Sequence, residues 1–299
     1  MKRIYGAAAM LTATVLWGLA FSAQSSGMTH IEPILFTALR SLLGAAVLMI
    51  SAWGFDLLRC GKVSCWGEHC TPESRRRLLT GGIWCGLVIA AASSLQQYGL
   101  KYIPAGKTGF LTALYIVAVP LLGIFFKRRA NWSLWLAVAI ALTGSWLLCG
   151  GISSMGAGEW CVIACALIYS VHVMVIDRYA ADCDCVRLSC IQFAVAALVT
   201  ALGSLILREP WSCGGIVAAM PYWVFCGIGS SAIAFTLQMV AQKYLHPVSA
   251  TLIMSLESVF AVLGGWLFLH EVLSGREMAG CAVILLAVIL AQLPLGKKS

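Results

Sequence analysis

Long apolar segments, separated by short polar stretches, recur along the whole chain. Ten of them reach the roughly 17–25 residues that a helix needs to cross a lipid bilayer. A helix is also the form that satisfies every backbone polar group in lipid. The pattern therefore predicts an all-α membrane protein with ten transmembrane helices. The predicted helices are 4–23, 33–55, 78–100, 105–126, 132–149, 158–176, 188–207, 222–240, 247–269 and 279–295.

The composition supports this prediction. Of the 299 residues, 61% are hydrophobic and only 11% are charged, whereas soluble domains carry about 25% charged residues. No soluble domain of any size is expected. The first apolar segment, after Lys2 and Arg3, imitates a signal peptide, but 4–23 is long enough to span. We predict that it is retained as the first helix.

The basic residues predict the orientation of the chain. The net charge is +8, and 15 of the 20 Lys and Arg residues fall in segments that share one side of the membrane if the amino terminus is inside. The positive-inside rule then places both termini in the cytoplasm of a plasma membrane of the bacterial inner-membrane type. The basic runs are topology signals, so no nucleic-acid partner is expected.

The chain also contains an internal repeat. A shift of 142 positions aligns 95–126 with 237–268, with nine identities in 32 positions and no gap. Each half holds five predicted helices, an odd number, so the halves must be inverted in the membrane. We predict two inverted five-helix repeats, 1–150 and 151–299, around a central cavity. This is the architecture of secondary transporters.

Glu257 stands near the middle of the segment 247–269. A carboxylate at that depth costs roughly 2.5–3.5 kcal/mol, so it should face protein or a wet cavity. Met254, Ala261 and Gly264 share its helical face and leave room for a neighbouring backbone or a ligand. The alternative is a carboxylate buried only for packing. We favour the functional interpretation.

The repeat extends this site hypothesis, because inverted repeats bring equivalent positions together around a two-fold axis. A shift of 152, which allows for ten extra residues in the basic loop 56–77, aligns the earlier helices. The shift of 142 pairs Gln96 with Gln238 and Tyr115 with Glu257, and the shift of 152 pairs Trp17 with Tyr169. They predict a substrate cavity with Glu257 as the coupling candidate. The two amides could equally well join helices, and packing is favoured for Trp17 and Tyr169.

Two further polar residues lie within apolar segments. Arg40 is about two turns into the second helix, at a depth that argues against a direct pair with Glu257, and we interpret it as mainly structural. His172 could relay protons. A lone histidine near a helix end is more often simply hydrogen-bonded, and that is our expectation.

No motif indicates catalysis, a metal or a cofactor. The chain has no HExxH, Walker or nucleophile-elbow pattern, so we predict that it is not an enzyme. Most of the 13 cysteines are scattered through apolar segments. Cys60, Cys65 and Cys70 share one loop but lack the paired CxxC spacing of zinc sites, and no metal is expected. Any other role for this loop is left open.

Several motifs resemble those of one transporter family. SLESVFAVLGGWLFLHE (255–271), LWGLAF (16–21) and the stretch 99–126 are similar to EamA-type carriers of the drug/metabolite transporter superfamily. The resemblance covers roughly 5–149 and 157–293. It implies a ten-helix fold, a central cavity and export or exchange of small metabolites, amino acids among them. Ser258 replaces the usual proline, and Lys127–Arg129 replace an acid found in many relatives.

We therefore predict a secondary transporter of small organic metabolites (amino acids, related solutes or drugs) that exports them by alternating access. Its expected partners are a small-molecule substrate and membrane lipids. The alternative from another class is a non-transporting membrane scaffold. The sequence leaves open the substrate, the direction of flux, proton or exchange coupling, and assembly into a homodimer.

Overall fold

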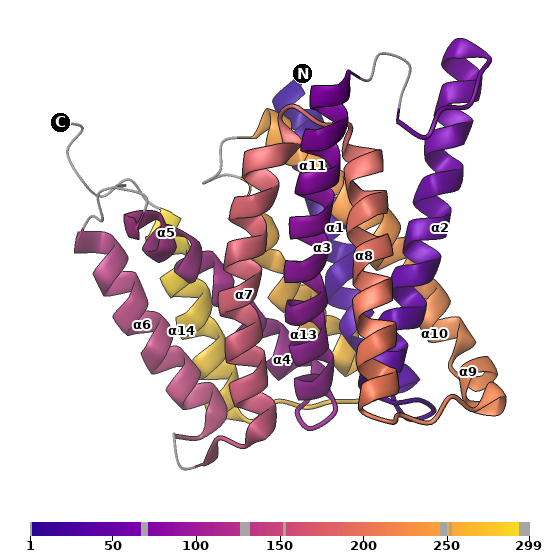
Figure 1. The fold of residues 1–299 in the computed structure, drawn as a ribbon. Helices are drawn as coiled ribbons and strands as arrows, with labels where there is room; N and C mark the ends of the chain where they lie inside the picture. Colours follow the sequence, from indigo (N-terminus) through magenta and orange to yellow (C-terminus); the bar gives the residue numbers. More distant parts are fainter. Residues whose placement is uncertain are drawn as a thin grey trace.

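The computed structural model describes residues 2–66, 71–125, 132–151, 154–245, 250 and 253–292, and all regular secondary structure in these ranges is helical (Figure 1). The elements are α1 (Lys2–Gly27), α2 (Pro33–Cys60), α3 (Pro72–Leu100), α4 (Ala105–Thr112), α5 (Tyr115–Phe125), α6 (Trp132–Cys149), α7 (Ala157–Ala180), α8 (Cys185–Ile206), α9 (Cys213–Ala218), α10 (Met220–Phe225), the π-helix η2 (Cys226–Ala234), α11 (Phe235–Tyr244), α13 (Leu256–Leu269) and α14 (Gly275–Gln292).

Six of the described spans are long and apolar enough to cross a membrane. They are Ile4–Gly27, Pro33–Arg59, Pro72–Leu100, Ala157–Ala180, Cys185–Ile206 and Met220–Tyr244. Three shorter apolar helices accompany them: Ala105–Val119, Trp135–Cys149 and Leu256–Leu269. The chain is thus a multi-pass, all-helical membrane protein. The full set of ten spanning helices remains a prediction.

Local sequence signals explain where the longer helices begin and end. The side chain of Thr71 accepts a hydrogen bond from the Ser74 backbone N–H, and Pro72 occupies the first turn of α3. Both are favoured at helix starts. Gly61, with φ +65°, ends α2 in the left-handed conformation that suits glycine. These signals lengthen α3 by six residues and α2 by five beyond the ranges predicted from hydropathy.

Two segments predicted as uninterrupted α-helices are wrong in their detail. The segment 105–126 contains a turn at Ala113 and Leu114, which separates α4 from α5. The segment 222–240 contains the π-helix η2 at its centre. Hydropathy cannot detect such changes, because the residues remain apolar throughout. Within 247–269, a turn at Ser255 precedes α13; residues 247–249 and 251–252 lie outside the described ranges.

The helices pack in a bundle in which distant parts of the chain lie side by side. α6 lies against α14, and α3, α7 and α8 form a neighbouring row (Figure 1). α2 packs on α8, and α1 packs on both α13 and the η2–α11 helix. Glycines permit the closest approaches, since Gly144 faces the backbone of Gly280, and Gly99 faces that of Gly158. This use of small residues is typical of helix contacts in membranes.

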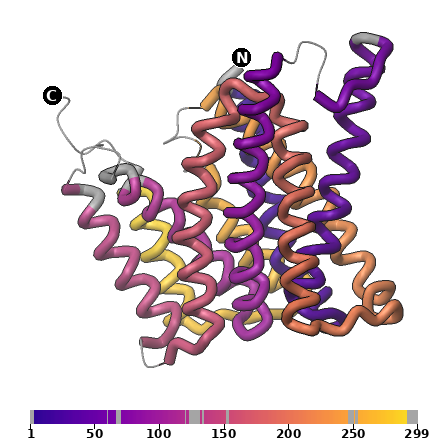
Figure 2. The backbone as a smooth tube through the Cα atoms, in the orientation of Figure 1, coloured from indigo at the N-terminus to yellow at the C-terminus, as the bar shows by residue number. Residues whose placement is uncertain are grey.

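The backbone tube in Figure 2 places the start of α1 and the end of α14 at the same end of the bundle. We call it the inner end, following the predicted orientation, and the opposite end the outer end.

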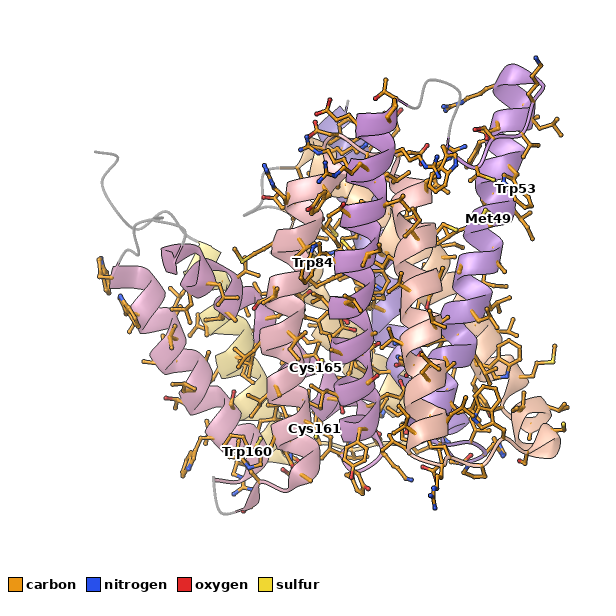
Figure 3. All side chains as sticks on the ribbon, in the orientation of Figure 1. Met49, Trp53, Trp84, Trp160, Cys161 and Cys165 are labelled. Carbon is orange, nitrogen blue, oxygen red and sulfur yellow. The ribbon has the colours of Figure 1, made fainter. Side chains whose placement is uncertain are left out.

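Large apolar side chains cover the outside of the bundle. Figure 3 labels Met49 and Trp53 on α2, Trp84 on α3 and Trp160 on α7, and each of these side chains is more than a third exposed. Ile206 is 79% exposed. A soluble protein rarely exposes so much apolar surface. The exterior is suited to contact with lipid tails.

Carboxylates close two helix starts at the outer end. Glu271 accepts hydrogen bonds from the backbone N–H groups of Ala105 (2.9 Å) and Gly106 (3.2 Å) at the start of α4. Glu209 accepts hydrogen bonds from Ile34 (3.1 Å) and Leu35 (2.7 Å) at the start of α2. In each case an acid from a distant segment satisfies donors that a helix leaves free. These contacts fasten the outer end.

Candidate functional site

A cavity lies between the helices in the middle of the bundle. About 480 Å³ within it is not filled by protein atoms, open space at its mouth included. Its wall receives side chains from α1, α2, α3, α4, α5, α7, η2, α11 and α13.

All six residues that the repeat argument selected lie on this wall: Trp17, Gln96, Tyr115, Tyr169, Gln238 and Glu257. They come from six different elements and from both halves of the chain. The structure therefore brings the predicted residues together. Their role in binding a substrate remains a proposal.

Glu257 is the second residue of α13, two residues after the turn at Ser255, and it is partly exposed. Tyr115 is the first residue of α5, directly after the turn at Ala113 and Leu114. The Tyr115 side chain interacts with the Glu257 carboxylate. Both side chains thus stand at a break in a helix at membrane depth, a feature that transporters use at their substrate and ion sites.

The small residues on the face of Glu257 accommodate neighbouring helices. A side chain at Gly264 would meet the Ser22 hydroxyl of α1 at 2.9 Å. Ala261 is fully buried and lies against Gly109 of α4. Met254 alone of this face lines the cavity. The close neighbours of α13 are therefore α1 and α4. Room for a ligand on this face remains only near the start of α13.

The two amides differ in their bonding. Gln96 donates from Nε2 to the Thr112 hydroxyl at 3.2 Å, and its Oε1 accepts a hydrogen bond from the Tyr169 hydroxyl at 3.5 Å. It therefore joins helices and lines the cavity at once. Gln238 is 1% exposed, and its Oε1 has no hydrogen-bond partner among the described residues. This oxygen is free to accept a bond from a ligand or a water.

Aromatic rings form much of the remaining wall. The Trp17 ring meets Phe235 edge-on at 4.9 Å between centroids, and the Tyr169 ring lies 6.2 Å from that of Tyr115. These are the packing contacts expected of Trp17 and Tyr169. The indole Nε1 of Trp17 is nevertheless buried without a partner in the described structure. Trp17 therefore offers a hydrogen-bond donor as well as a packing surface.

His172 also lines the cavity and is 1% exposed. One of its ring nitrogens, Nε2, lies 2.9 Å from Oε1 of Gln192. The expectation that this histidine is simply hydrogen-bonded is confirmed as far as this contact goes.

Sequence reasoning underestimated two residues on the wall. Arg40 is 6% exposed, interacts with the Tyr169 hydroxyl, and keeps its Nε without a partner in the described part of the chain. Gln24 is 3% exposed, and its Oε1 is likewise unpartnered there. For Arg40 the sequence did offer a signal, its depth within a membrane helix, because an ionisable residue at such a position is a functional candidate by default. An interior arginine should therefore have been ranked with Glu257.

Outside the spanning segments, Lys101 and Glu32 form an ion pair at the outer end. Lys101 donates to Glu32 at 2.6 Å. This hydrogen bond raises the pKa of Lys101 above its usual value. Because both side chains are more than a third exposed, the pair adds little stability.

The described residues contain no group of three or more His, Cys, Asp or Glu side chains that could hold a metal ion. Cys65, in the loop between α2 and α3, is free and exposed. Cys70 lies outside the described ranges, so the role of this loop stays open.

An apolar exterior and an internal cavity with unpartnered polar atoms define a membrane protein of the solute-transporting class. The chain belongs to the EamA-like transporter family, whose model matches residues 4–150 and 156–293. This membership confirms the resemblance drawn from the motifs.

Named relatives support the same class. The chain is 23% identical to an uncharacterized transporter of Archaeoglobus fulgidus, over 98% of this chain and 87% of the relative. It is 24% identical to the threonine/homoserine exporter RhtA of Salmonella typhimurium, over 83% of this chain and 78% of that protein. It is also 24% identical to a probable terminal-alkyne amino-acid exporter of Streptantibioticus cattleyicolor, over 94% of this chain and 91% of the relative.

A solved crystal structure of another protein, 23% identical in sequence, has the same fold. The TM-score is 0.67, and the alignment covers 96% of both chains. At this identity the likeness establishes the fold alone.

Proposed function

We propose that this protein is a secondary carrier that exports small organic metabolites of the amino-acid type across the plasma membrane. The observation that carries the proposal is the central cavity, in which charged and amide side chains from both halves of the chain keep unpartnered atoms among the described residues. Buried polar groups normally have partners. Groups left without one, on the wall of a cavity, are suited to receive a solute.

The relatives narrow the class of solute. Two of them are named as exporters of amino acids, RhtA and the probable terminal-alkyne amino-acid exporter. An amino-acid substrate is therefore part of the proposal for this chain. It agrees with the presence of Glu257, which can recognise an ammonium group.

The packing supports two inverted five-helix repeats, 1–150 and 151–299, as the mechanical units. Under such symmetry the contact of α3 with α7 is equivalent to that of the η2–α11 helix with α1, and both contacts occur. The contact of α1 with α13 is equivalent to that of α7 with α4 and α5, and both occur again. The same symmetry maps the contact between α2 and α8 onto itself, and it does the same for the contact between α6 and α14. Rocking of one repeat against the other would then expose the cavity to each side in turn.

Glu257 is the proposed coupling residue. It stands at the start of a half-helix on the cavity wall, with Tyr115 as its neighbour. Gain or loss of a proton, or pairing with a substrate ammonium group, would change the charge at the centre of the moving parts. Either event can bias the two states of the carrier.

A thermal-shift screen tests the proposal. Purified protein is heated with amino acids, nucleosides, sugars and cationic drugs, and the wild type is compared with Glu257→Gln. A solute that binds the native state stabilises it by RT ln(1 + [L]/Kd). We expect amino acids to raise the melting temperature of the wild type and to lose this effect in Glu257→Gln. If no solute changes the melting temperature and no solute flux is seen in vesicles, the scaffold alternative is favoured.

A further inference from the structure

Arg40 and Glu257 are opposite charges on the wall of one cavity, supplied by α2 and α13. We propose that they form a two-ended site for a zwitterion, in which Arg40 binds the carboxylate and Glu257 binds the ammonium group of a free α-amino acid. The inference rests on the proposed function and specifies the substrate of the same cavity.

The first support is that the two charges do not neutralise each other. Among the described residues, no ion pair within 4.0 Å involves either Arg40 or Glu257. Arg40 is 6% exposed, and its Nε has no partner in that part of the structure. A buried charge without an opposite charge is costly and calls for a partner. A bound ligand can supply it.

The second support is the pair of tyrosines that neighbour the charges. Tyr169 interacts with Arg40, and Tyr115 interacts with Glu257. Their rings lie 6.2 Å apart. Each charge therefore has a neutral tyrosine, rather than the opposite charge, as a neighbour. The two ends are thereby kept available to a ligand with two charged groups of its own.

The third support is the balance of charge. Arg40 and Glu257 together contribute no net charge, so a zwitterion adds none and can pair at both ends. An amine without a carboxylate leaves Arg40 unpaired, and an acid without an amine leaves Glu257 unpaired. Each would lose affinity, because removing one partner of a buried charge is strongly unfavourable. Oε1 of Gln238 and Nε1 of Trp17, unpartnered among the described residues, remain for the polar part of a side chain.

Three ligands that share a CH3–CH(OH)–C unit test the inference on the wild-type protein. L-Threonine carries both charges, 1-amino-2-propanol lacks the carboxylate, and 3-hydroxybutyrate lacks the amino group. Affinities are measured by calorimetry on the purified, detergent-solubilised protein. We expect threonine to bind at least tenfold more tightly than either fragment. Equal binding of threonine and one fragment would overturn the two-ended site.

Variants assign the two ends. Arg40→Gln should weaken the binding of threonine at least tenfold and leave the binding of 1-amino-2-propanol unchanged. Arg40→Lys should still bind threonine more tightly than 1-amino-2-propanol. Glu257→Gln should weaken threonine and leave 3-hydroxybutyrate unchanged. Arg59→Gln, an exposed position on the same helix as Arg40, is the matched control. If Arg40→Gln weakens threonine and 1-amino-2-propanol equally, the role of Arg40 is structural and the inference fails.

The wild-type comparison needs no variant, so poor folding of Arg40→Gln cannot leave the question undecided. Flux assays separate the two levels of the argument. Export of another solute class, with no preference for zwitterions, would overturn this site and keep the carrier. Absence of flux for every solute would overturn the carrier itself.

Discussion

Tyr115 and Glu257, which stand 142 positions apart in the chain, interact on the wall of the central cavity. The two positions are equivalent in the internal repeat, and each lies within two residues of a turn that interrupts a helix. The repeat therefore relates backbone geometry as well as side-chain positions. A site at the junction of two related halves can change shape when one half moves against the other.

Close packing of α1 on α13 depends on Gly18. A Cβ atom at this position would lie 2.8 Å from the carbonyl carbon of Phe260 and 2.9 Å from the backbone nitrogen of Ala261. Backbone atoms cannot move aside cheaply, so Gly18→Ala should destabilise the protein by about 1–3 kcal/mol. Gly54→Ala is the control, because nothing lies within 4 Å of that Cβ. A lower melting temperature for Gly18→Ala alone is expected; equal melting temperatures would contradict the packing.

The carboxylate of Glu271 holds the start of α4 through the backbone N–H groups of Ala105 and Gly106. Glu271→Ala removes both bonds and should cost about 0.5–2 kcal/mol, the usual range for loss of a helix cap. Glu73→Ala, at an exposed position, serves as the comparison. Thermal unfolding in detergent measures both variants. Indistinguishable melting curves for the two would show that the outer end does not depend on this contact.

Arg187 joins three segments near the inner end. Its guanidinium donates to Asp56 at 2.6 Å and 2.7 Å, to Asp184 at 2.9 Å and to the backbone carbonyl of Ser64 at 3.2 Å. Its side chain is 9% exposed, and that of Asp56 is 14% exposed. Breaking so buried a pair from one side should cost about 3 kcal/mol.

Arg187→Gln should therefore unfold at a clearly lower temperature than the wild type. Arg59→Gln removes an exposed arginine from the neighbouring end of α2 and should be nearly neutral. If both variants melt alike, the ion pair does not hold the 56–66 segment to α8.

Two exposed cysteines report the orientation of the chain. Cys65 follows α2 at the inner end, and Cys213 begins α9 at the outer end. With each as the only cysteine, an impermeant maleimide should label Cys213 in intact cells and Cys65 only in inverted vesicles. The reverse pattern would place both termini outside and reject the positive-inside assignment.

The positions of the long helices could be predicted from hydropathy, and the bounds of 132–149 agree with those of α6. The turns at Ala113–Leu114 and Ser255 could not, because no proline or glycine marks them. The π-helix η2 was also beyond prediction, since its residues read as one apolar run.

The six cavity residues could be selected because the repeat pairs polar or aromatic positions. Arg40 meets the same criterion, but its depth led us to interpret it as mainly structural; its equivalent under the shift of 152 is Gln192. That side chain is fully buried and contacts His172 instead of lining the cavity. Gln24 escaped because its equivalent is the apolar Ile176. The repeat argument finds a cavity residue when the equivalent position in the other half also lines the cavity. It misses a cavity residue when the two halves differ at that position.

The central claim is that Glu257 makes this cavity a route for solute. Proteoliposomes containing wild type, Glu257→Gln or the exposed-site control Glu73→Gln are preloaded with L-threonine, and the entry of labelled L-threonine by exchange is followed. The account predicts exchange in the wild type and the control, and a loss of at least tenfold in Glu257→Gln at equal protein insertion. Exchange at the wild-type rate in Glu257→Gln would contradict it.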